Sequence, residues 1–98
     1  MTIFHFITIE EWSKAQLDSL YTPHSLETDG FIHCCTSDQL DGMAKRLSNA
    51  GNNLLLEIDE DLVEPQVIYE DLYGLNQLFP HIYGALNLNS IRHIHQVE

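Results

Sequence analysis

Two histidines lie inside short hydrophobic segments that each run directly into the start of a helix. His5 lies within residues 3–7 and His33 within residues 31–35. The segments that follow, Thr-Ile-Glu-Glu and Thr-Ser-Asp-Gln, have the capping-box pattern that begins a helix. Backbone N–H groups at a helix start attract negative charge and bind phosphate, and burying a polar ring without a partner is costly. We therefore interpret both histidines as residues of a site for a small anionic ligand.

The predicted strand at 31–35 has two apolar faces. Alternation places Phe31, His33 and Cys35 on one face and Ile32 and Cys34 on the other, as in a strand buried on both sides. Adjacent cysteines on opposite faces do not form a disulfide with each other, which agrees with a reducing compartment. Because the first residues also lack the pattern of a signal peptide, we expect a cytoplasmic protein.

Net charge limits the partners of this protein. The chain has 98 residues, with four Lys and Arg against fifteen Asp and Glu, for a net charge of −11. A protein that holds a long nucleic acid uses several basic side chains on phosphates, so we expect no tight binding to long RNA or DNA. A small nucleotide remains compatible, since one helix N-terminus and one arginine can neutralise a pyrophosphate. No apolar run approaches the ~20 residues that span a bilayer, and we expect no membrane association.

The length predicts one domain, residues 1–98. Hydrophobic periodicity predicts, in chain order, a strand at 2–7, a helix at 9–20, a loop at 21–25, a strand at 31–35, a helix at 37–48 with a C-cap at 49–53, strands at 54–58 and 67–71, a loop containing Gly74 and Pro80, and a long strand at 81–89. Helices come early and strands late, which favours an α+β fold with two early helices packed on a mostly antiparallel sheet. In the last strand, His81 and Tyr83 share one face.

Three other interpretations compete with ligand binding by these histidines. His93 and His95 are two residues apart and would share one face of a strand, a spacing that can chelate zinc or copper; the cysteine spacing is not that of a zinc site, and we expect no physiological metal. Cys35 could act as a nucleophile beside His33, but no third orienting residue is evident. Trp12 and Tyr73 could instead form the apolar patch of an interaction module.

Several motifs together are similar to one family of small bacterial proteins. These motifs, spread over nearly the whole chain, are Ile3-Phe4-His5, Glu11-Trp12, Tyr21, Ser25-Leu26, Gly30-Phe31-Ile32-His33-Cys34, Gln39-Leu40 and Phe79-Pro80-His81-Ile82-Tyr83-Gly84. They resemble the domain of unknown function 952, which itself looks like a compact ADP-ribosyltransferase fold near the RNA 2′-phosphotransferases. The resemblance implies that His5 meets the nucleotide ribose and that His33 lies beside the nicotinamide ribose. It also implies a third site residue on a later strand, for which His81 and Tyr83 are the best candidates.

The sequence thus predicts a cleft that binds a nucleotide. The catalytic candidates are His5, His33 and His81, and the ligand-binding candidates are Tyr21, Ser25, Thr36 and Tyr83. We expect NAD or a related nucleotide, with transfer of an ADP-ribosyl or related group as a consequence. Such a transfer passes through a ribosyl cation that a carboxylate can stabilise. Glu70 is the nearest candidate, although its position is more typical of a half-exposed strand residue. The alternative is a non-catalytic binding or regulatory module that retains the fold. The sequence leaves the oligomeric state open.

Overall fold

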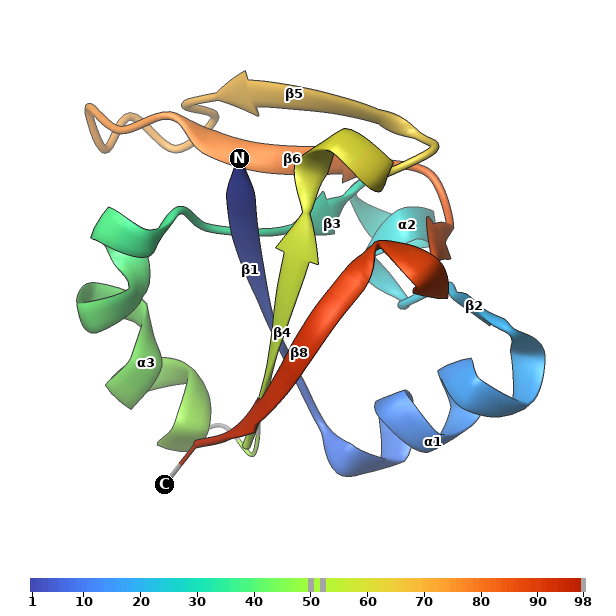
Figure 1. The fold of residues 1–98 in the computed structure, drawn as a ribbon. Coiled ribbons are helices and arrows are strands. Elements are labelled where there is room, and N and C mark those ends of the chain that lie inside the picture. Colours follow the sequence, from blue (N-terminus) through green and yellow to red (C-terminus); the bar gives the residue numbers. More distant parts are fainter. Residues whose placement is uncertain (50, 52, 98) are drawn as a thin grey trace.

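Short antiparallel sheets flanked by helices make up this protein (Figure 1). The computed structural model describes residues 1–49, 51 and 53–97. In chain order the elements are β1 (Thr2–Ile7), α1 (Ile9–Asp18), β2 (Leu20–Tyr21), α2 (Ser25–Thr28), β3 (Ile32–His33), the 3₁₀ turn η1 (Ser37–Gln39), α3 (Leu40–Asn49), β4 (Leu54–Asp59), η2 (Glu60–Leu62), β5 (Gln66–Glu70), β6 (Phe79–Tyr83), β7 (Leu86–Asn87), η3 (Leu88–Ser90) and β8 (Ile91–Gln96). This arrangement is the α+β class expected from the sequence.

The described strands pair in three antiparallel sheets. Their strand orders are β1-β4-β8, β2-β7 and β3-β6-β5. An isolated bridge between Phe4 and Cys35 joins the first sheet to the chain just after β3. The two backbone N–H···O bonds of this bridge are each 2.8 Å long. The bridge therefore brings β1, which carries His5, beside residues 33–35.

Strand β1 is buried on both faces because its side chains alternate between two hydrophobic clusters. Ile3 and Ile7 belong to the larger cluster, and Phe4 and Phe6 belong to the smaller one. The larger cluster includes Ala15 of α1, Tyr21, Ile32, Leu56, Ile58, Ile82 and Leu86, whereas Leu40, Met43 and Ala44 of α3 pack against the smaller one. Figure 1 shows α1 and α3 on opposite sides of β1. Each fully buried isoleucine contributes roughly 1.5–3 kcal/mol, so this packing fixes β1 and the position of His5 within it.

Both predicted capping boxes are present. The Thr8 N–H donates to Glu11 Oε1 at 3.2 Å, and the Thr36 N–H donates to Gln39 Oε1 at 2.9 Å. The first helix nevertheless ends at Asp18 rather than at residue 20, because the next residue adopts the left-handed conformation with a φ of 60°. That turn redirects the chain into β2, which the sequence does not predict.

Residues 21–35 differ from the predicted loop and strand. Tyr21 ends β2, and α2 begins at Ser25, where the sequence predicts only a loop. Gly30 follows with a φ of +85°, a conformation that glycine adopts without strain. The strand predicted at 31–35 is confined to 32–33, because Cys35 turns away to pair with Phe4 of β1.

The long strand predicted at 81–89 is broken into two. Strand β6 starts at Phe79, so Pro80 lies inside a strand rather than in the preceding loop. The chain turns at Gly84, where a Cβ atom would come within 3.0 Å of Pro65, and then forms the two-residue strand β7. The predicted C-cap at 49–53 includes residues 50 and 52, which are outside the described part of the chain.

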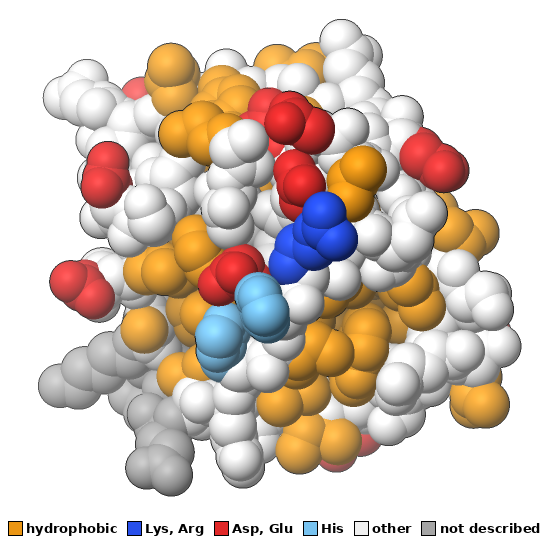
Figure 2. Space-filling model, viewed as in Figure 1, with side chains coloured by type: hydrophobic (Ala, Val, Ile, Leu, Met, Phe, Trp, Pro, Cys, Tyr) orange, Lys and Arg blue, Asp and Glu red, His pale blue; other side chains and the backbone are white. Residues whose placement is uncertain are grey.

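Strand β8 forms the outer strand of the first sheet. Its pairing with β4 shifts register between Glu57 and Ile58, and all of its residues after Ile91 are exposed. Exposed hydrophobic side chains gather beside the histidines on this face of the molecule (Figure 2). Over the described residues, no helix is long and apolar enough to cross a membrane.

Candidate functional site

His5 links two parts of the chain through both nitrogens of its buried ring. The ring is 9% exposed, and Nδ1 lies 2.5 Å from the backbone carbonyl oxygen of His33. Because a carbonyl only accepts, Nδ1–H must donate, and Nε2 then accepts from the Tyr21 hydroxyl at 2.7 Å. Burial lowers the pKa of His5 below its usual value of 6.5. At neutral pH the ring is therefore uncharged and occupied at both nitrogens.

A cavity of about 250 Å³ lies beside the bridge between β1 and the segment after β3. Its lining residues are Phe4, His5, Phe6, His33, Cys34, Cys35 and Met43. Strands β1 and β3 belong to different sheets, and the bridge brings β1 beside the segment that follows β3. Both histidines still line the one cavity. Its lining combines aromatic and sulfur-containing residues with two histidines, a composition typical of ligand pockets.

The His33 side chain reaches the surface rather than the core. It is 41% exposed, and its Nε2–H donates to Asp29 Oδ2 at 2.8 Å. The cost of burying a polar ring, which supports a functional role for His33 in the sequence, thus applies to His5 and not to this side chain. Asp29 is four residues before His33 on the segment that follows α2. This carboxylate orients the imidazole through Nε2.

A second histidine–carboxylate pair lies on the neighbouring strands β6 and β5. His81 is 1% exposed, and its Nδ1–H donates to Glu70 Oε1 at 2.8 Å. The Tyr83 hydroxyl donates to the same oxygen. These two hydrogen bonds, that of Tyr83 first, lower the pKa of Glu70, and the bond to Glu70 raises the pKa of Tyr83. His81 and Tyr83 therefore share one face of the strand, as alternation predicts, and both hydrogen-bond to the Glu70 carboxylate.

Phe31 connects the two pairs. Its ring stacks on His81 with centroids 4.0 Å apart and an interplanar angle of 21°, and its centroid lies 4.7 Å from that of His33. The His33 and His81 rings are 5.7 Å apart and nearly perpendicular, since the two residues are cross-strand partners. Tyr73 in the loop after β5 faces His33 at 6.4 Å. We call this group of side chains the histidine cluster: Asp29, Phe31, His33, Glu70, Tyr73, His81 and Tyr83.

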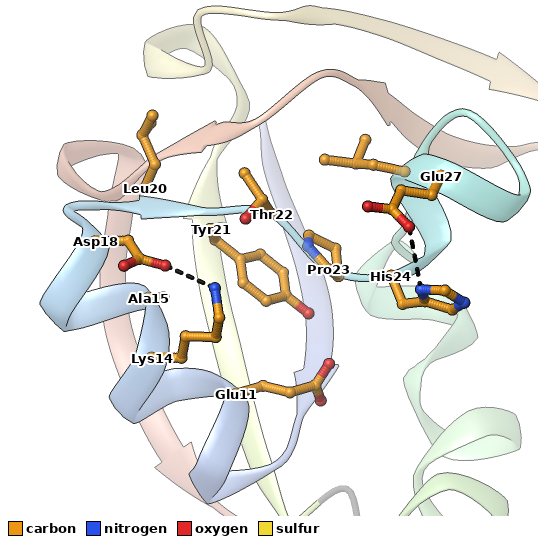
Figure 3. Close-up of a pocket in the computed structure, with 11 residues that line it drawn as sticks. Glu11, Lys14, Ala15, Asp18, Leu20, Tyr21, Thr22, Pro23, His24 and Glu27 are labelled. Carbon is orange, nitrogen blue, oxygen red and sulfur yellow. Dashed lines mark hydrogen bonds and ion pairs between the residues drawn. The ribbon is translucent and has the colours of Figure 1, made fainter.

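Tyr21 connects His5 to a second hollow, of about 470 Å³, between α1 and residues 20–27 (Figure 3). Figure 3 shows the Tyr21 ring at the centre of this hollow with the Glu11 carboxylate facing its hydroxyl. Burial is the main reason that the pKa of Tyr21 is raised, and the negative charge of Glu11 adds to it. The Tyr21 hydroxyl thus donates to His5, and this hydrogen bond joins a lining residue of the hollow to one of the cavity.

The two remaining ligand-binding candidates serve local structure. Ser25 begins α2, and its carbonyl accepts the N–H groups of Asp29 and Gly30. Thr36 caps η1 through its reciprocal pairing with Gln39. Within the described residues, neither side chain hydrogen-bonds to a member of the histidine cluster, although Thr36 directly follows the cavity residue Cys35.

The cysteines are buried thiols with little nucleophilic character. Cys34 and Cys35 are both free. Burial raises the pKa of Cys35 to about 11 and raises that of Cys34 further. Because the thiolate is the reactive form, a Cys35 nucleophile is not supported at neutral pH.

The sequence points to the histidines and to Glu70, but it misses Asp29, the carboxylate partner of His33. Asp29 has one local signal, its spacing of four residues from His33. Glu70 appears in the sequence only as one possible carboxylate, whereas it binds both His81 and Tyr83. His93 and His95 lie on β8 near Glu57, at 3.9 and 3.2 Å from its carboxylate oxygens. In the part of the chain that is described, no group of three side chains has geometry suited to a metal ion.

These features define a small α+β domain with paired histidine and carboxylate side chains beside an apolar cavity. The chain belongs to the family described as "Protein of unknown function (DUF952)", which matches residues 6–94. The crystal structure of protein CC0527 from Caulobacter crescentus is similar over 100% of this chain and 87% of that chain, with a TM-score of 0.84 and 19% identity. A double mutant of the same protein gives a TM-score of 0.83 at 19% identity. At this identity the likeness concerns the fold alone. No curated protein matches the chain.

Proposed function

We propose that this domain binds NAD or a related nucleotide around His33, on an ADP-ribosyltransferase-like fold. The proposal rests on one observation: His33 lines the 250 Å³ cavity and also belongs to the histidine cluster. A nucleotide combines a planar ring with ribose hydroxyls. The ring would enter the cavity, and the hydroxyls would meet the imidazole and carboxylate groups at its mouth.

The volume of the cavity is suited to one end of such a ligand. Pockets for a whole small molecule occupy about 300–1,000 Å³, so 250 Å³ suits a single ring rather than a dinucleotide. Phe4 and Phe6 offer aromatic walls, and the exposed His33 marks the exit toward solvent. The remainder of the nucleotide would lie on the surface, toward the helix start at Thr36, where backbone N–H groups favour phosphate.

Charge favours the oxidised form of the cofactor. Neither the cavity lining nor the histidine cluster contains Lys or Arg, whereas Asp29 and Glu70 are carboxylates. A carboxylate attracts the positive nicotinamide ring of NAD and gains nothing from the neutral ring of NADH. The arrangement thus supports a ligand whose cationic ring lies beside His33 and its carboxylate partner Asp29, with its phosphates farther away.

A nucleotide bound in this way would also be placed for group transfer. When the bond between nicotinamide and ribose breaks, positive charge develops on the ribose, and a fixed carboxylate stabilises it. Glu70 is suited to this role because Tyr83 and His81 hold it in place and keep it ionised. His33, oriented by Asp29, would position a ribose hydroxyl or accept the proton of an acceptor.

A melting experiment with matched ligands tests the proposal. Wild-type protein is heated with NAD, NADH or ADP-ribose at about millimolar concentration, since a ligand that binds only the folded state raises the melting temperature. We expect NAD to give the largest shift and NADH a smaller one. Free nicotinamide, measured by chromatography after incubation with NAD, reports transfer or hydrolysis. Identical melting curves with all three ligands would refute nucleotide binding.

A non-catalytic binding or regulatory module is the second candidate. The bonding of His5 favours it, since both ring nitrogens already serve the link between Tyr21 and the His33 backbone. A residue held in this way stabilises structure and is not free to move a proton. Stabilisation by NAD without any release of nicotinamide would select this candidate over a transferase.

A further inference from the structure

Strand β8 presents an unpaired edge. It is the last strand in the order β1-β4-β8 and, among the described strands, pairs with β4 alone. In an antiparallel pair, alternate residues direct their N–H and C=O groups away from the partner. Every residue from Arg92 to Gln96 is exposed. The edge contains no proline or lysine, residues that commonly prevent a strand from pairing with another chain.

The charge along the chain singles out this edge. The segment 72–97 contains no Asp or Glu, although the whole protein carries fifteen. With a net charge of −11, two copies repel each other over most of their surfaces. The nearest carboxylates on β4 are already close to basic groups of β8, Asp59 to Arg92 at 3.6 Å and Glu57 to His95 at 3.2 Å. Contact along β8 therefore avoids the repulsion and leaves no excess positive charge for an acidic partner.

The edge strand β5 of another sheet shows the contrast. Strand β5 ends the order β3-β6-β5. It contains Glu70 and is flanked by Glu64 and Asp71. Acidic side chains at an edge oppose pairing with a second acidic chain. Self-association through β5 is thus disfavoured, while β8 lacks this protection.

A hydrophobic groove runs beside β8. It has a volume of about 390 Å³ and is lined by Trp12, Leu88, Ile91, Arg92, His93 and Ile94. Figure 2 shows this hydrophobic surface next to the histidines on the same face. Ile94, at 42% exposed, projects from the strand without full burial. A side chain from a partner strand could enter the groove while the backbones pair.

We propose that β8 pairs antiparallel with β8 of a second copy and forms a symmetric dimer. A two-fold contact is self-complementary, so each copy presents the same edge and the same groove to the other. The backbone edge supplies the hydrogen bonds, each Ile94 enters the groove of its partner, and the acid-free surface removes the charge barrier. This assembly is independent of nucleotide binding and leaves the histidine cluster unused.

Sedimentation analysis of the full chain tests the dimer. The protein is measured from about 5 to about 500 µM, a range that brackets the dissociation constant of a modest interface. We expect the mass to rise to twice that of the monomer. Ile94→Asp places a carboxylate from each copy in the contact and should raise the dissociation constant at least about tenfold. Leu62→Asp is the matched control, because Leu62 is 41% exposed and lies on η2 rather than on β8.

Hydrogen exchange of the wild-type protein provides a measurement that needs no variant. The β8 amides that point away from β4 should exchange more slowly as the concentration rises, whereas amides of exposed turns should not change. A monomer at every concentration with unchanged exchange in β8 would overturn the proposal. A dimer that Leu62→Asp weakens and Ile94→Asp leaves intact would overturn it as well.

Discussion

Replacement of His33 by glutamine separates ligand binding from fold stability. The side chain is 41% exposed and has one hydrogen bond, to Asp29. The link to His5 uses the backbone carbonyl of His33 and therefore survives the substitution. Glutamine can still donate to Asp29. We expect His33→Gln to lower the free energy of unfolding by only about 0.2–1 kcal/mol, the range for an exposed ionic contact.

The stabilisation of the wild-type protein by NAD should exceed the loss of stability caused by His33→Gln. NAD at about ten times its dissociation constant stabilises the folded state by about 1.4 kcal/mol. For a domain of this size that corresponds to a rise of roughly 6–11 °C in melting temperature. If His33→Gln weakens binding about tenfold, the same NAD concentration gives only about 0.4 kcal/mol, or roughly 2–3 °C.

His81→Gln is the matched comparison. His81 is 1% exposed, stacks on Phe31 and donates to Glu70. Disrupting this buried contact should cost about 1–3 kcal/mol without ligand. Both variants and the wild type are measured by urea denaturation for stability and by thermal melting with and without NAD for binding.

The two roles of His33 give opposite results. A structural histidine would make His33→Gln as unstable as His81→Gln, while the remaining folded protein kept its full response to NAD. That result would refute the assignment of His33 to the ligand. A wild-type protein whose melting is unchanged by about millimolar NAD would remove the nucleotide interpretation altogether and favour a binding module for another ligand.

Three further predictions concern the buried link and the charge. Tyr21→Phe removes the donor to His5 Nε2 and should lower the free energy of unfolding by about 1–3 kcal/mol in urea; wild-type stability would show that the bond contributes nothing. Because burial lowers the pKa of His5 below 6.5, the unfolded chain binds a proton that the folded chain does not as the pH falls. Stability should therefore decrease by up to about 1.4 kcal/mol between about pH 7.5 and 5.5, and a flat profile would contradict a neutral buried ring. Finally, the net charge of −11 predicts weak or absent binding to tRNA-sized RNA at about 150 mM salt, and micromolar affinity in a filter-binding assay would reveal a basic surface not anticipated here.

Local sequence patterns correctly predict where a helix or 3₁₀ turn begins after each of the two histidines. The capping boxes at 8–11 and 36–39 form as predicted, because their hydrogen bonds connect residues only three apart. Alternation correctly places His81 and Tyr83 on one face, since a strand side chain points according to its position alone. The α+β class follows from the order of helical and strand patterns.

Contacts between distant segments bring together most of the residues of the candidate site. His5 hydrogen-bonds to the His33 backbone, 28 residues away in the sequence. Glu70 accepts hydrogen bonds from His81 and Tyr83 because β5 pairs with β6. No local pattern encodes such contacts, because they depend on which strands pair and in which register. The Phe4–Cys35 bridge likewise ends the predicted strand early. The sequence alone determines which side chains are available for chemistry, and tertiary packing determines which of them meet, since backbone pairing between remote segments sets their distances.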